Sequence, residues 1–292
     1  MMAFITGDEG FLGRHFREQL LRKGFDVGGC DIKSGTDCRE FFNAKSWPEL
    51  QLAIHCAAIV GGRENIEKNP LGIAENFELD SAFFRWAVKA KPKRVIYLSS
   101  SAIYPVRLQT MWQQERLIET HVNIRDYRMD KPDANYGWAK LIGEMLATQL
   151  REQTNTKVTI VRPFSGYGAD QDDTYPFPAF IARAKRRDDP FEIWGNGTQT
   201  RDFIHVDDLV ETALTAAYAD EPGPMNICSG YGTSFIELAN KVCEIAGYSP
   251  TYQMIRDAPR GVEYRVGDPS IMIAFRRPRI TLESAIEQAL GM

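Results

Sequence analysis

The sequence predicts an α/β protein with a doubly wound parallel sheet and a smaller, interleaved C-terminal lobe. Two observations support this fold class. In the first half of the chain, short apolar runs alternate with segments of helical periodicity, and strands in such alternation are joined by crossover helices that cover both faces of a parallel sheet. After Pro163 the alternation gives way to stretches rich in Gly, Pro and Asp, which are typical of a partly loop-built lobe.

Each element of the sheet follows from a local pattern. Short apolar runs bounded by turn residues predict strands, whereas apolar residues that recur every three to four positions predict helices. One such helix carries the stripe Leu79, Phe83, Trp86 and Ala90, which fits packing on a sheet. The expected strands are residues 3–6, 25–30, 52–58, 94–100 and 157–163, and the expected helices are residues 10–23, 39–42, 76–90 and 137–149.

The second half of the chain predicts the lobe and its interleaving. Residues 166–180 and 195–203 carry strong turn signals, whereas residues 204–217 return to a strand-and-helix pattern. We therefore assign that last segment to the sheet domain, and we expect the lobe to cover an edge of the sheet. The expected domains are residues 1–163 plus about 204–228, which form the sheet domain, and residues 164–203 plus 229–292, which form the lobe.

Composition and charge exclude several classes of protein. The chain has 43% hydrophobic and 25% charged residues, and its net charge of −4 predicts no general attraction to nucleic acid or to an anionic membrane. No apolar run approaches the length of a membrane span, and the N-terminal MMAFITG resembles a strand rather than a signal peptide, so we expect a cytoplasmic protein. The cysteines form no C-x-x-C pair and the histidines lack ligand spacing, so we expect reduced thiols and no bound metal.

The segment after the first expected strand predicts a phosphate-binding turn. Gly7, Gly10 and Gly13 are spaced three apart between a strand and a helix. Glycine at these positions permits a tight turn and lets a diphosphate approach the backbone N–H groups at the helix N-terminus. A glycine triplet alone is weak, but in this context it predicts a Rossmann-type dinucleotide site.

The residue that ends the second expected strand bears on the choice of cofactor. The carboxylate of Asp31 can accept hydrogen bonds from both hydroxyls of an adenosine ribose and would repel a 2′-phosphate. This predicts NAD as the cofactor. Lys33 and Arg39 lie nearby and keep NADP as the alternative, and a simple turn role for Asp31 is the other interpretation.

The heptapeptide ANYGWAK, residues 134–140, places Tyr136 and Lys140 four residues apart at the start of an expected amphipathic helix. One helical turn separates them, so the phenol and the ammonium can point into the same space. A positive charge near a phenol lowers its pKa, which suits a general acid/base. On spacing alone, an ordinary exposed Tyr and Lys would be the simpler interpretation.

Six segments, in this order, resemble the extended short-chain dehydrogenase/reductase family, and within it the NAD-dependent epimerase/dehydratase group that acts on nucleotide sugars. The match covers nearly the whole chain. Local similarity extends to GDP-fucose synthase and GDP-mannose 3,5-epimerase, through residues 57–62 and 99–105. The segments are Gly7-x-x-Gly10-x-x-Gly13, His55-Cys56-Ala57-Ala58, Ser99-Ser100-Ser101, Tyr136-x-x-x-Lys140, Arg162-Pro163-Phe164, and residues 199–208 with the sequence QTRDFIHVDD.

The resemblance implies a role for each matching residue. Tyr136 would exchange a proton with a sugar hydroxyl, Lys140 would hold the nicotinamide ribose, and Ser100, or Ser101 as the fallback, would align the reacting oxygen. Arginine would clamp the diphosphate, since its planar fork pairs with two phosphate oxygens. The implied cofactor-binding residues are Gly7, Gly10, Phe11, Leu12, Gly13, Asp31, Asp37, Ala57, Tyr136, Lys140 and Pro163. The implied substrate-binding residues are Gly61, Gly62, Ser101, Ser165, Arg201, Arg260 and Arg265.

Departures from the family pattern narrow the reaction. Ala102 stands where dehydratases of the group carry an acid, which disfavours dehydration. GDP-mannose 3,5-epimerase and GDP-fucose synthase carry a cysteine at the same place. Ala102 therefore also disfavours deprotonation at two carbons, unless His121 or another group supplies the base. Ser165 stands where many relatives carry asparagine, so contacts to the diphosphate may differ. The remaining set of serine, Tyr136, Lys140 and a tightly held NAD suffices for an NAD-dependent nucleotide-sugar epimerase that works through a transient 4-keto sugar. The alternatives are a 4-ketoreductase or dehydratase of the same family and, from another class, a non-catalytic dinucleotide sensor.

The resemblance also implies the partners. We expect a nucleotide-sugar substrate, no nucleic acid and no membrane. Family members often pair two helices per subunit in a dimer, and the helices of residues 76–90 and 136–150 are the candidates for a homodimer interface.

Overall fold

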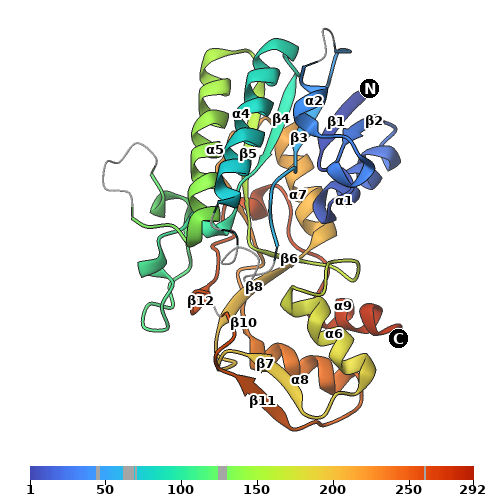
Figure 1. Ribbon diagram of the computed structural model, residues 1–292, viewed down its shortest axis with the longest axis vertical. Helices are drawn as coiled ribbons and strands as arrows, with labels where there is room; N and C mark the ends of the chain where they lie inside the picture. Colours follow the sequence, from blue (N-terminus) through green and yellow to red (C-terminus); the bar gives the residue numbers. More distant parts are fainter. Residues whose placement is uncertain (44–46, 62–68, 70, 124–129, 260) are drawn as a thin grey trace.

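The fold is described by a computed structural model for residues 1–43, 47–61, 69, 71–123, 130–259 and 261–292. Six parallel strands form one sheet in the order β2-β1-β3-β4-β5-β9 (Figure 1). The α/β class and its parallel sheet are therefore confirmed. These strands are β1 (Met2–Thr6), β2 (Asp26–Cys30), β3 (Leu52–His55), β4 (Arg94–Leu98), β5 (Lys157–Pro163) and β9 (Met225–Ile227).

Helices cover both faces of this sheet because its strands send alternate side chains to opposite sides. On one face, Ile5 and its neighbours pack against α1 (Phe11–Arg22) and α7 (Val206–Tyr218). On the other face, Phe4 and its neighbours pack against α4 (Gly72–Ala90). The same face also carries α5 (Ala134–Gln153) and the short α2 (Cys38–Phe41). The predicted helices are thus present, with α4 about one turn and α5 about two turns longer than expected.

The lobe has a hydrophobic core of its own. It lies beyond the carboxyl ends of the sheet strands (Figure 1), so the expectation that it covers a sheet edge is wrong. The reason is that the chain enters it from the carboxyl end of β5. Its strands are β6 (Ser165–Tyr167), β7 (Phe191–Trp194), β8 (Thr200–His205), β10 (Gly232–Ser234), β11 (Tyr252–Ile255) and β12 (Tyr264–Arg265), and its helices are α6 (Pro176–Arg186), α8 (Phe235–Ile245) and α9 (Leu282–Leu290).

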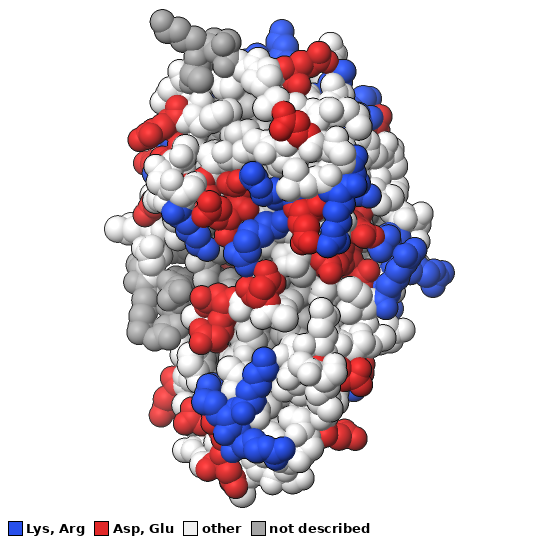
Figure 2. All heavy atoms as spheres, turned by 90° about the vertical axis from the view of Figure 1, so that its right-hand side faces the viewer, with Lys and Arg blue, Asp and Glu red and all other residues white. Residues whose placement is uncertain are grey.

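The chain crosses between the two parts more than once. It leaves the large sheet after β5, forms β6 to β8 in the lobe, and returns through α7 to β9, which pairs with β5. The domain boundaries stay a prediction, which this path supports. Among the described residues, no helix is long and apolar enough to cross a membrane. Figure 2 shows Lys and Arg intermixed with Asp and Glu across the middle of one face, so this face carries no large field of one sign.

Candidate functional site

The candidate site lies at the carboxyl ends of the sheet strands, where parallel sheets bind ligands. Ser100 lies two residues after the end of β4, and α5 supplies Tyr136 and Lys140. The helix approaches closely because of Gly137: a Cβ there would lie 2.4 Å from the Ala102 carbonyl oxygen. The glycine of the heptapeptide therefore brings the tyrosine up to the serine turn.

The Ser100 side chain lies close enough to Tyr136 to act on the phenol through a hydrogen bond, which by itself lowers the pKa of Tyr136. The Ser100 Oγ also accepts a hydrogen bond from the Ala102 backbone N–H at 3.0 Å, which caps the short helical turn Ser101–Ile103. Ser101, the fallback, is buried within that turn. Of the two serines, Ser100, the first choice from the sequence, is thus the one that acts on the phenol.

The pKa of Tyr136 departs from the sequence-based expectation. Burial raises it above its usual range, the negative charge of Asp80 raises it further, and the hydrogen bond with Ser100 opposes both effects. Lys140 lies 5.9 Å from the Tyr136 ring centroid. The expectation of a lowered pKa is therefore wrong for this structure, because loss of hydration and the Asp80 carboxylate outweigh the hydrogen bond with Ser100.

Lys140 is itself buried, with 3% of its surface exposed. Its Nζ lies 5.2 Å above the centroid of the Tyr97 ring. Burial lowers its pKa, and the carboxylate of Asp80 opposes that shift. A buried lysine is positively charged only while its amine is protonated, and that protonation depends on the neighbouring groups.

A hydrogen-bonded network that was not predicted from the sequence is centred on Asp80, next to the Tyr97 ring that Lys140 contacts. Asp80 on α4 accepts the Tyr97 hydroxyl at 2.6 Å and contacts the His55 Nε2 at 3.0 Å. The other ring nitrogen of His55 lies 2.7 Å from the Thr6 Oγ1. One signal was available: an acidic residue at position 80 interrupts the apolar stripe of the helix.

The glycine turn has the geometry that a diphosphate requires. Gly7 has a φ of +69°, and a Cβ at this position would lie 2.7 Å from the Ala57 backbone nitrogen. A Cβ at Gly13 would lie 2.0 Å from the Gly7 carbonyl oxygen. Gly10 caps α1 without a side-chain hydrogen bond, so Phe11 and Leu12 begin a helix whose first N–H groups can bind an anion. These residues fit a dinucleotide.

Two carboxylates, one after β2 and one at the start of α2, were predicted to bind the cofactor. Asp31 accepts hydrogen bonds from the backbone N–H groups of Lys33 at 2.8 Å and Glu9 at 3.2 Å. Asp37 caps α2 and pairs with Arg39, whose guanidinium also reaches Glu78 at 2.7 Å. The basic residue Arg39, which kept NADP as an alternative, is therefore held by two carboxylates.

The predicted substrate residues are not all gathered at one point. Arg201 and Arg265 are aligned on neighbouring strands of the lobe. The Arg265 guanidinium lies 2.6 Å from the Asp133 carboxylate, at the start of α5, and the Arg201 guanidinium lies over the Phe235 ring at 5.6 Å. Ser165 begins β6, and Gly61, itself half-buried, follows the exposed Ile59 and Val60 after β3. Gly62 and Arg260 lie outside the described residues.

The remaining candidates can be placed as well. Ala57 donates its backbone N–H to the Thr6 Oγ1 at 3.2 Å, and Pro163 ends β5. His121, considered as a second base, accepts a hydrogen bond from the Ile118 backbone N–H at 3.3 Å through its Nδ1. That contact ties the imidazole to its own turn.

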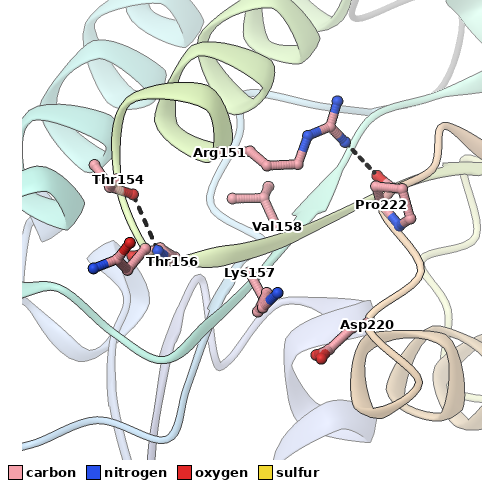
Figure 3. Close-up of a pocket in the computed structure, with 8 residues that line it drawn as sticks. Arg151, Thr154, Thr156, Lys157, Val158, Asp220 and Pro222 are labelled. Carbon is pink, nitrogen blue, oxygen red and sulfur yellow. Dashed lines mark hydrogen bonds between the residues drawn. The ribbon is translucent and has the colours of Figure 1, made fainter.

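A surface pocket of about 490 Å³ lies at the opposite end of the sheet, where α5 ends and β5 begins (Figure 3). Arg151 donates to the Pro222 carbonyl at 3.2 Å across its rim, and the Thr156 N–H donates to the Thr154 Oγ1 at 3.1 Å. The pocket contains none of the predicted site residues.

Comparisons with known proteins show the family and the fold of this chain. The sequence profile described as "NAD dependent epimerase/dehydratase family" matches residues 3–228. A dTDP-4-dehydro-6-deoxy-D-allose reductase from a Streptomyces species is 28% identical over 92% of this chain and 89% of its own length. GDP-mannose 3,5-epimerase from Arabidopsis thaliana is 27% identical over 92% of this chain and 75% of its own length. The crystal structure of Thermus thermophilus UDP-glucose 4-epimerase with NAD shares the fold, with a TM-score of 0.81 and 20% identity, over 100% of this chain and 98% of that chain.

Proposed function

This chain belongs to the NAD-dependent epimerase/dehydratase family, and on that premise we propose that it is an NAD-dependent nucleotide-sugar epimerase acting through a transient 4-keto sugar. The contact between Ser100 and Tyr136, with Lys140 one turn further along α5, is the observation that carries this proposal. It places a hydrogen-bond donor, an acid/base and a cation around one point at the carboxyl end of the sheet.

The chain's own groups divide the chemistry between them. A dinucleotide held by the glycine turn supplies a hydride acceptor. The Ser100 hydroxyl donates to the reacting sugar oxygen and fixes its position, while the Tyr136 oxygen accepts the hydroxyl proton as the C4 hydride leaves. The ketone then accepts hydride on its opposite face and recovers the proton from Tyr136. Lys140 stabilises the phenolate that accepts the proton and that forms again when the proton returns to the sugar oxygen.

The cofactor preference follows from Asp31. A carboxylate on the adenosine side disfavours a 2′-phosphate, and Arg39 is engaged by Asp37 and Glu78. We therefore propose NAD, retained through the catalytic cycle. Retention matters because an epimerase returns the hydride that it removed.

A 4-ketoreductase is the second candidate, and one observation favours it. The raised pKa of Tyr136 keeps the phenol protonated near neutral pH. A protonated phenol is ready to donate to a ketone oxygen, which is the first requirement of reduction. A relative named as a 4-dehydro-sugar reductase, at 28% identity, supports the same alternative.

One experiment separates the two reactions. We expect purified protein to interconvert C4 epimers within a panel of nucleotide hexoses without added cofactor. Consumption of added NADH or NADPH by 4-keto sugars, with no interconversion of the epimers, would establish the reductase instead. Tyr136→Phe should lower turnover by about a hundredfold or more while NAD binding is retained. Equal turnover in Tyr136→Phe would refute the assignment of the acid/base.

We also propose a homodimer formed by α4 and α5. These two helices pack side by side on one face of the sheet (Figure 1). Val88 on α4 and Met145 on α5 are 49% and 44% exposed. Apolar side chains on the outer surface of a helix pair are suited to pairing with a second copy.

A further inference from the structure

Asp80 is a buried carboxylate in the middle of α4, with 3% of its surface exposed. Burying a charged side chain is unfavourable unless hydrogen bonds and an opposite charge compensate for lost hydration. Both of its oxygens are engaged, one by Tyr97 from β4 and one by His55 from β3. The carboxylate is therefore fixed by groups from two neighbouring strands.

The hydrogen bonds around His55 run in one consistent direction. Ala57 donates its N–H to the Thr6 Oγ1, so the threonine hydroxyl is free to donate to the His55 Nδ1. This assigns the ring proton to Nε2, which donates to Asp80. Burial lowers the pKa of His55, so the ring is neutral near pH 7. The chain of donors ends on Asp80 and leaves the carboxylate ionised.

The charge that compensates Asp80 is Lys140. Burial alone would raise the pKa of Asp80, but the Lys140 ammonium together with the two hydrogen bonds holds it below its usual range. Tyr97 lies between the two groups: its hydroxyl bonds Asp80, and its ring lies below the Lys140 Nζ. The carboxylate and the ammonium therefore share one aromatic side chain.

Other titratable groups around Lys140 do not replace this carboxylate. Burial raises the pKa of the Cys56 thiol, so it is uncharged near neutral pH. Burial likewise raises the pKa of Tyr97 and of Tyr136. Glu144, one turn further along α5, is held by Arg162 at 2.8 Å.

We propose that Asp80 is the positioning residue that keeps Lys140 charged and in place, with His55 and Tyr97 holding the carboxylate. This inference rests on the proposed function, because it assigns the ammonium its task beside Tyr136. Without Asp80, the buried lysine would lose its proton at a lower pH. The Tyr136 phenolate, which exchanges the proton with the sugar oxygen, would then lack a cation beside it.

The position of Gly143 supports this role. A Cβ at Gly143 would lie 1.6 Å from the Tyr97 hydroxyl and 2.4 Å from an Asp80 carboxylate oxygen. Gly143 follows Lys140 by three residues on the same side of α5. The missing side chain is thus what allows the hydroxyl and the carboxylate to lie against the helix that carries the lysine.

The test measures the protonation of Lys140 directly. Protein labelled with ¹³C at the lysine ε-carbons is titrated by NMR, and Lys140→Met identifies the signal. We expect Asp80→Asn to lower the Lys140 titration midpoint by about one pH unit or more, as loss of a nearby opposite charge does. Turnover should fall about tenfold or more at the pH optimum of the wild type, with little change in KM. An unmoved Lys140 midpoint in folded Asp80→Asn overturns the proposal.

Two further variants keep the test decisive. Asp208→Asn is the matched control. Asp208, on α7, is also a buried carboxylate, but it accepts hydrogen bonds from the backbone N–H groups of Arg279 and Ile280. It should leave the Lys140 midpoint unchanged. If Asp80→Asn does not fold, Asp80→Ser supplies the uncharged replacement and is judged by the same midpoint.

The two proposals fail in different ways. If Asp80→Asn shifts the Lys140 midpoint but the wild-type protein converts no nucleotide sugar, the proposed function is refuted and the pairing of Asp80 with Lys140 stands. Turnover of a nucleotide sugar with an unmoved midpoint in Asp80→Asn would do the reverse.

Discussion

Gly143 occupies a position on α5 where even a methyl group has no room. We predict that Gly143→Ala destabilises the protein, although alanine is the better helix former by about 1 kcal/mol. The new Cβ would overlap the Tyr97 hydroxyl and approach Asp80 to 2.4 Å, and both side chains are buried. One of the two must move.

The magnitude follows from these contacts. Overpacking a core costs about 1–3 kcal/mol, and losing a hydrogen bond to a charged group costs about 1.5–3 kcal/mol. After subtracting the gain in helix propensity, the free energy of unfolding should fall by about 1.5–5 kcal/mol. For a chain of 292 residues the entropy of unfolding is about 0.6 kcal/mol/K, so this corresponds to a Tm lower by roughly 2–8 °C.

The assay is urea unfolding followed by circular dichroism, with a double-mutant cycle as the control. In a Tyr97→Leu background the hydroxyl and the ring edge are gone, so Gly143→Ala should cost about 1 kcal/mol less than it does in the wild type. A Gly143→Ala protein as stable as the wild type would refute the close approach of Tyr97 and Asp80 to α5. So would an equal cost in both backgrounds.

Three further predictions concern the cofactor, the dimer and pH. Asp31→Ser should weaken NAD binding roughly tenfold and reduce the preference for NAD over NADP in fluorescence titrations; an unchanged preference would contradict the role of the carboxylate. Met145→Glu should give monomers in sedimentation experiments, whereas Leu21→Glu, on α1 and 52% exposed, should not; a dimeric Met145→Glu protein would move the interface elsewhere. Burial opposes protonation of His15, but hydrogen bonds to Asp207 and Asp170 raise its pKa overall. The stabilisation from the protonated imidazole is therefore present below about pH 6.5 and is lost as the pH rises through the raised pKa. His15→Asn should therefore lower stability at about pH 5.5 and not at about pH 8.5, by less than about 1 kcal/mol because the two carboxylates are partly exposed, and an equal loss at both would contradict this.

The sheet could be predicted from the sequence because its information is local. Apolar runs and glycine turns report on strands and their ends wherever they occur, and the Tyr136–Lys140 spacing follows from helix geometry. Helix α6 departs from the sequence-based expectation, because Pro176 and Pro178 indicate turns in a segment rich in Gly and Asp. Proline is compatible with the first turn of a helix, however, since the N–H groups there have no partner within the helix.

The environment of the site could not be predicted in the same way. The pKa of Tyr136 depends on how deeply α5 is buried, and spacing carries no information about burial. The contacts among His55, Asp80 and Tyr97 join three elements that are separated in the sequence and meet only when the sheet and α4 are packed. The pairing of Arg265 with Asp133 joins the lobe to the start of α5, and the two residues are 132 positions apart.

The inward face of α5 carries two buried charges that are compensated from elsewhere in the fold. Lys140 is matched by Asp80 on α4, and Glu144 receives two hydrogen bonds, at 2.9 and 2.8 Å, from the Arg162 guanidinium on β5. Such pairs add little stability over apolar packing, yet removing one partner costs about 3–5 kcal/mol. A shift of α5 by one residue would rotate its side chains by about 100° and separate both pairs together. The register of the helix is thus fixed by charge as well as by shape, and with it the place of the Tyr136 phenol, the acid/base of the proposed reaction.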